Sequence, residues 1–169
     1  MLRRGLDQLA DLLAKVGPGD LARSTPCAEW SLGELVDHVV AAPEKFARMV
    51  RGESIDWSAP TPAAGDNPAG AFRAHGDELL AALGDGAGRE GAPGADWQCA
   101  ELAVHTWDLA TALGESTDGL EPEVAERGLA LMQDNLTAEN RDPAFGPAQP
   151  APDGANAYDR IAAFAGRSV

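Results

Sequence analysis

The short stretch Cys99–Trp107, CAELAVHTW, constrains the fold more strongly than any other part of the sequence. It is apolar at nearly every position, which is typical of a helix that is buried on most sides. It nevertheless carries Glu101 and His105, and a spacing of four residues places their side chains on one face of a helix. A buried carboxylate without a partner costs several kcal/mol. If Glu101 is buried in such a helix, the fold must bring a positively charged partner to it.

A metal ion is one such partner, because no Lys or Arg occurs between Arg89 and Arg127. Zinc binds imidazole nitrogen and carboxylate oxygen, and a catalytic site needs a third protein ligand and an open position. His38, in the apolar run 35–40, is the first candidate for that ligand, and His75 is its competitor in a more charged neighbourhood. Two other interpretations remain open. The Glu/His pair can be solvated or half-buried without a metal, or a cationic side chain from a distant segment can pair with Glu101.

Charge and hydropathy argue against several functional classes. A net charge of −14 disfavours binding to nucleic acid and to anionic membrane surfaces. No apolar run approaches the roughly 20 residues that cross a bilayer, and the N-terminal segment lacks the features of a signal peptide. We therefore expect a cytoplasmic protein whose cysteines, Cys27 and Cys99, are reduced, with Cys27 nearer to a functional site.

The apolar periodicity predicts an all-α fold in a single domain over residues 1–169. Amphipathic patterns and Pro/Gly punctuation predict helices over about 2–16, 32–50, 68–83, 95–113, 121–138 and 158–166. Ser31 and Glu34 match a capping box for the second of these helices, and Pro43 predicts a kink or local break inside it. Residues 140–156 are Pro-rich and should be extended, with Phe145 as an anchor.

Three further residues are candidates for the surroundings of the site. Asp108 follows His105 by three residues and either orients its imidazole or pairs with an arginine or caps a helix. Trp57, in a Pro-rich loop, either covers a pocket or packs elsewhere, and Cys27 lies in the loop before the second helix. The Gly-rich run 84–94 does not match a phosphate-binding loop and indicates a flexible connection.

Four segments together resemble the actinobacterial DinB-like family of the mycothiol-dependent maleylpyruvate isomerase N-terminal type. They are 25–30 (TPCAEW), 35–38 (LVDH), 100–110 (AELAVHTWDLA) and the tail from Phe145-Gly146-Pro147 to Asp159-Arg160-Ile161. The resemblance extends over nearly the whole chain. It implies a four-helix bundle with up-down-down-up topology, extra short helices and an extended C-terminal segment.

The resemblance also implies a divalent metal, usually zinc, with Ni²⁺ or another divalent ion as alternatives, held by His38, Glu101 and His105. In this family the metal receives the thiolate of a low-molecular-weight thiol, so mycothiol is the expected cosubstrate. The chain has Ala28-Glu29 where the family more often has Pro-Gly, and it ends at Val169 without the isomerase's second domain. We therefore expect a thiol transferase acting on a small electrophile, as a monomer or homodimer. A binding module without turnover and a metal-dependent hydrolase are the alternatives.

Overall fold

The computed structural model describes residues 1–27, 30–56, 58–86, 94–141 and 145–169. Within these ranges the chain forms six helices and no strand, which confirms the all-α expectation. The helices are α1 (Leu2–Leu13), α2 (Leu32–Val50), α3 (Pro68–Gly86), α4 (Ala95–Leu113), α5 (Pro122–Asn135) and α6 (Ala157–Phe164). The up-down-down-up order of a bundle stays a prediction.

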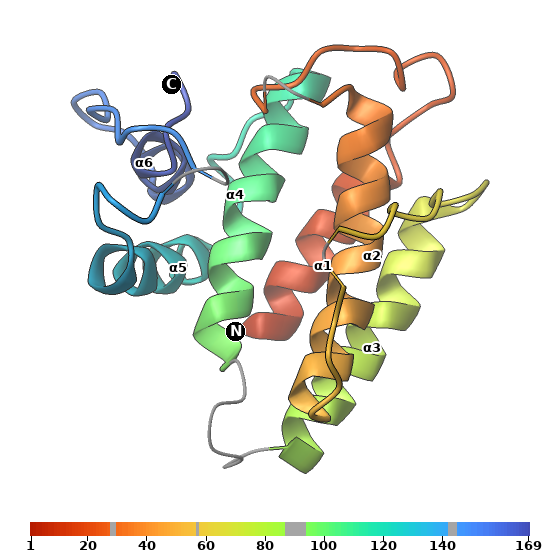
Figure 1. The fold of residues 1–169 in the computed structure, drawn as a ribbon. Helices are drawn as coiled ribbons and strands as arrows, with labels where there is room; N and C mark the ends of the chain where they lie inside the picture. The colour runs from red at the N-terminus through yellow and green to blue at the C-terminus, as the bar shows by residue number, and fades with distance from the viewer. Residues whose placement is uncertain (28–29, 57, 87–93, 142–144) are drawn as a thin grey trace.

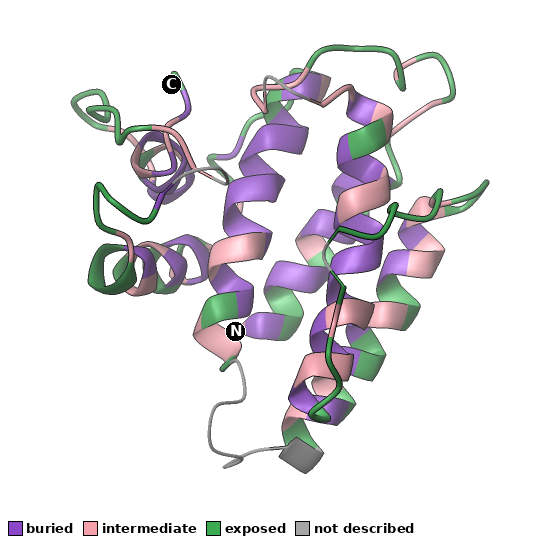
Figure 2. Cartoon of the chain, viewed as in Figure 1, coloured by how far each residue is buried: buried purple, intermediate pink, exposed green. Residues whose placement is uncertain are grey.

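The first four helices lie alongside one another, and α5 and α6 pack against α4 on the side away from α2 and α3 (Figure 1). All six helices contribute side chains to the main core, including Leu9, Leu35, Phe72, Leu109 and Ile161. Helix α4 contacts α1, α2, α5 and α6. It is therefore buried along most of its length (Figure 2), as the apolar character of its sequence predicts.

Helix α2 begins where its capping box predicts. The Ser31 hydroxyl accepts a hydrogen bond from the Glu34 amide, and the Ser31 amide donates to the Glu34 carboxylate at 2.8 Å. Gly114 ends α4 in the left-handed conformation, with φ +75°. The cap at Ser31 thus fixes where α2, which carries His38, begins. Gly114 fixes where α4, which carries Glu101 and His105, ends.

Some predicted helix limits differ from the structure. Helix α2 continues through Pro43, so a local break there is wrong, whereas a kink stays a prediction. Packing explains this, because Ala42, Phe46 and Val50 form a small buried cluster with Leu79 and Ala82 of α3 on both sides of the proline. Helices α1 and α5 end at Leu13 and Asn135, three residues before their predicted ends. Helix α3 ends at Gly86, three residues after its predicted end.

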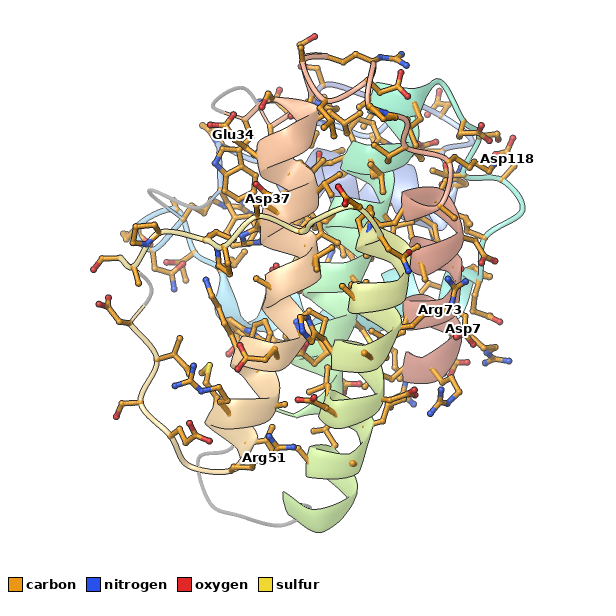
Figure 3. The ribbon with its side chains drawn as sticks, turned by 90° about the vertical axis from the view of Figure 1, so that its right-hand side faces the viewer. Asp7, Glu34, Asp37, Arg51, Arg73 and Asp118 are labelled. Atoms are coloured by element: carbon orange, nitrogen blue, oxygen red, sulfur yellow. The ribbon has the colours of Figure 1, made fainter. Side chains whose placement is uncertain are left out.

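Polar contacts on the outer side of the bundle join α3 and the segment before it to α1 and α2. Arg73 of α3 forms an ion pair of 2.6 Å with Asp11 of α1. Asp37 of α2 accepts a hydrogen bond of 2.8 Å from the Ala64 amide, where the chain crosses α2 before entering α3 (Figure 3).

Gly128 brings α5 close to α4. A Cβ at this position would lie 2.7 Å from the Cα of Ala100 and 2.9 Å from Ile161 Cδ1. Because backbone cannot yield as a side chain does, we expect Gly128→Ala to lower the free energy of unfolding by about 1–3 kcal/mol. Gly84→Ala is the matched control, since a Cβ there meets nothing within 4 Å. It should stabilise α3 by about 0.5–1 kcal/mol. Denaturant unfolding should show a lower free energy of unfolding for Gly128→Ala and a higher one for Gly84→Ala than for the unaltered protein.

Candidate metal centre

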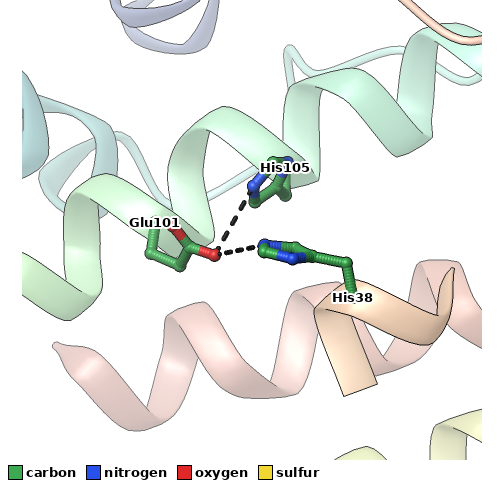
Figure 4. Close-up of side chains that lie close together, drawn as sticks. All are labelled: His38, Glu101 and His105. Atoms are coloured by element: carbon green, nitrogen blue, oxygen red, sulfur yellow. Dashed lines mark hydrogen bonds and ion pairs between the residues drawn. The ribbon is translucent and has the colours of Figure 1, made fainter. Parts of the chain in front are cut away.

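Three side chains from two helices converge on one point. His38 Nε2 of α2 lies 2.8 Å from Glu101 Oε1 of α4, and His105 Nε2 lies 3.5 Å from the same oxygen (Figure 4). The three ligand atoms all lie within 4.8 Å of one another. The spacing of Glu101 and His105 on α4 and the capped register of α2 produce this meeting. His38, rather than its competitor, is therefore the third member of the group.

The charges of this group stabilise an ionised carboxylate. Burial alone raises the pKa of Glu101, but the charge of His105 and the hydrogen bond from His38 outweigh it and bring the pKa to about 2. Burial lowers the pKa of His105, and Glu101 and Asp108 raise it by more. One carboxylate oxygen and two imidazole nitrogens are ligand types that zinc binds, and a bound ion would take the place of the proton on the imidazole nitrogen that faces Glu101.

Asp108 fulfils two of the roles that the sequence left open. Its carboxylate accepts a hydrogen bond of 3.2 Å from His105 Nδ1, which leaves Nε2 of that imidazole facing Glu101. It also forms a two-point ion pair with Arg167, with Nε to Oδ1 and Nη2 to Oδ2 both 3.0 Å. Burial raises the pKa of Asp108, and these two partners lower it by more. Asp108 thus links the imidazole to the C-terminal segment.

Arg167 is not among the residues that the sequence predicts for the site. Its side chain is almost completely buried, and it reaches Asp108 from a position 59 residues further along the chain. The only sequence signal is indirect, since a carboxylate on the buried helix α4 needs a cation. A pair so far apart in the sequence forms only if the C-terminal tail folds back on α4, and the apolar periodicity of the sequence does not predict that fold-back.

A cavity of about 260 Å³ adjoins the three converging side chains. One wall is Trp30, whose ring centroid lies 4.6 Å from that of His38 and 6.0 Å from that of His105. Most of the remaining wall comes from apolar side chains of α4, α5 and the segment after them: Trp97, Val104, Leu131, Met132, Leu136 and Phe145. The polar lining includes Cys27, Asn135 and Arg167. The converging group thus has access to a space that can hold a small molecule.

The other candidate residues are placed as follows. His75 lies on α3 and contacts the Val40 carbonyl through Nδ1 at 2.7 Å, outside the group of possible ligands. Cys27 lines the cavity. Cys99 is fully buried, and burial raises the pKa of its thiol to about 11, so it stays protonated. Trp57 lies outside the described residues, so its proposed position over a pocket stays a prediction.

No described helix is long and apolar enough to span a membrane.

Two comparisons with known proteins give matches to this chain. The family model described as "Mycothiol maleylpyruvate isomerase N-terminal domain" matches residues 2–75, which include His38. The chain is also 32% identical over 177 residues to "Uncharacterized protein MT0763" and to "Uncharacterized protein Rv0738", from two strains of Mycobacterium tuberculosis. Each alignment covers 99% of this chain and 96% of the relative, and so includes Glu101 and His105. No solved structure matches the chain significantly.

Proposed function

We propose that this chain, which belongs to the mycothiol maleylpyruvate isomerase N-terminal domain family, binds a divalent metal ion through His38, Glu101 and His105 and transfers a small thiol to an electrophile. Zinc is the proposed ion and mycothiol the proposed thiol, and the reaction is placed in the cytoplasm. The observation that carries the proposal is the convergence of two imidazoles and one carboxylate beside a cavity.

The donor set fits a catalytic ion. Within the described part of the chain, the Glu101 carboxylate has His38 and His105 as its hydrogen-bond and ion-pair partners. Three protein ligands leave a position open for a further ligand. The family shown above is named for mycothiol, which supports a thiol as that ligand. A bound divalent ion would lower the pKa of a coordinating thiol and hold the thiolate as a nucleophile.

The protein's own residues prepare the reaction in three ways. Asp108 fixes the imidazole of His105 by accepting its Nδ1 hydrogen, and Arg167 fixes Asp108 in turn. Trp30 packs against the His38 imidazole, with 4.6 Å between the ring centroids, and so helps to hold its orientation. The cavity provides room for the electrophile next to the thiol, which places the two reactants close together.

Metal analysis and a thiol-dependence assay test the proposal together. We expect about one divalent ion per purified chain, and conversion of a model electrophile such as 1-chloro-2,4-dinitrobenzene only when both thiol and metal are present. Turnover with water alone would identify a hydrolase, and metal binding without any turnover would identify a binding module. A chain that takes up no divalent ion at all would contradict the proposal.

A further inference from the structure

A second, much smaller cavity adjoins the candidate centre. Glu101 and His105 line it as well as the larger cavity, and Gln98 of α4 is the further polar residue in its wall. The rest of the wall is apolar and comes from α1, α2, α3 and α4: Leu9, Val39, Ala42, Pro43, Phe72 and Leu102. The volume of this small cavity is about 10 Å³, which is the lower limit of the roughly 10–15 Å³ that one water molecule needs. Its size therefore suits a single water and no larger ligand.

Gln98 has a buried donor that needs a partner. It is only 2% exposed, and among the residues that the structure describes its Nε2 has no hydrogen-bond partner. Bound water satisfies most buried polar groups that have no protein partner. Gln98 precedes Glu101 by three residues and His105 by seven, so the three side chains share one face of α4. The amide and the carboxylate thus line the same small cavity.

Glu101 has an acceptor to offer in return. His38 Nε2 and His105 Nε2 both contact its Oε1, at 2.8 and 3.5 Å (Figure 4). These contacts leave Oε2 available for a donor from another direction. The apolar side chains around the small cavity offer no donor, and a hydrogen bond bridged by water is nearly as favourable in enthalpy as a direct one. One water can therefore satisfy both the amide and the second carboxylate oxygen.

We propose that one water molecule binds in the small cavity, accepts a hydrogen bond from Gln98 Nε2 and donates one to Glu101 Oε2. This water holds the carboxylate with Oε1 directed at His38 and His105. Gln98 is then a positioning residue for Glu101. The inference rests on the proposed function only in its effect on the metal, because the water needs no metal in order to bind.

Crystal structures of the metal-free protein and of Gln98→Met test the water directly. Methionine has about the length of glutamine and cannot donate a hydrogen bond. We expect density for one water within hydrogen-bond distance of Gln98 Nε2 and Glu101 Oε2, and its loss in Gln98→Met without a change of fold. A small cavity without that density in the unaltered protein would overturn the proposal, as would a water that persists in Gln98→Met.

Zinc affinity tests the positioning role. Gln98→Met should weaken zinc binding about 10–100-fold, measured by competition with a chromophoric chelator. Thr106→Val is the matched control, because Thr106 Oγ1 is likewise buried on α4 without a partner among the described residues and Thr106 lines neither cavity. Its zinc affinity should stay unchanged. Equal affinity in Gln98→Met and in the unaltered protein would refute the positioning role.

Cobalt(II) gives a readout that a merely structural role of Gln98 would not change. The visible absorption of this ion weakens as its coordination number rises. Without the water, Glu101 can bind through both oxygens, so we expect weaker absorption per bound ion in Gln98→Met at saturating cobalt. Thr106→Val should show the spectrum of the unaltered protein. An unaltered spectrum in Gln98→Met would show that the carboxylate is held without Gln98 and overturn the inference.

The same measurements separate this inference from the proposed function. Water between Gln98 and Glu101 in a protein that takes up neither zinc nor cobalt would refute the proposed metal centre and support the water site. Tight zinc binding that Gln98→Met does not alter would support the metal centre and refute the role of Gln98.

Discussion

His38→Ala is expected to abolish stoichiometric binding of a divalent ion while the protein stays folded. The substitution removes the one proposed ligand that α2 contributes and leaves Glu101 and His105 as a pair on α4. Loss of an outer hydrogen-bond partner of a ligand already costs about 10–100-fold in metal affinity. We therefore expect the loss of a direct ligand to exceed about 100-fold. Competition with a chromophoric chelator measures the affinity.

His75→Ala is the matched control for that experiment. Its imidazole contacts the Val40 carbonyl and lies outside the candidate centre, so metal affinity should not change. When the free zinc concentration is 100 times Kd, the free energy of unfolding should rise by about 2.7 kcal/mol in His75→Ala and in the unaltered protein. His38→Ala should show no such gain. Unchanged zinc affinity in His38→Ala would remove His38 from the centre.

Much of the centre can be derived from local sequence rules. The helical repeat places Glu101 and His105 on one face because they are four residues apart. The capping box at Ser31 and Glu34 fixes where α2 begins, and hence where His38 stands in its register. Both rules act over less than two helical turns, which is the range over which sequence patterns are informative.

The surroundings of the centre depend on contacts between distant segments. Arg167 meets Asp108 only because the tail folds back against α4. Leu131 and Phe145 enter the cavity wall through the packing of α5 and of the segment that follows it. The continuity of α2 through Pro43 has the same origin, since the side chains that support it belong partly to α3. In each case tertiary packing decides what local propensity leaves open.

Among the polar contacts of the described residues, the Arg167–Asp108 ion pair should cause the largest loss of stability when one partner is removed. Arg167→Met leaves the Asp108 carboxylate fully buried without its two-point partner, and we expect the free energy of unfolding to fall by about 3–5 kcal/mol. Asp108→Asn should have a similar effect and should also weaken metal binding about 10–100-fold, because Asp108 holds His105. Denaturant unfolding and chelator competition measure the two effects separately.

Arg73→Met provides the control, because it breaks an exposed arginine–aspartate pair, which joins α3 to α1. Arg73 is 47% exposed and its partner Asp11 is 73% exposed, so water already solvates both charges. The expected loss there is below about 1 kcal/mol. The double variant Asp108→Asn/Arg167→Met should lose less stability than the two single losses added together, since neither charge is then left buried alone. If the single losses simply add, or if Arg167→Met is no worse than Arg73→Met, the buried pair does not hold the tail against α4.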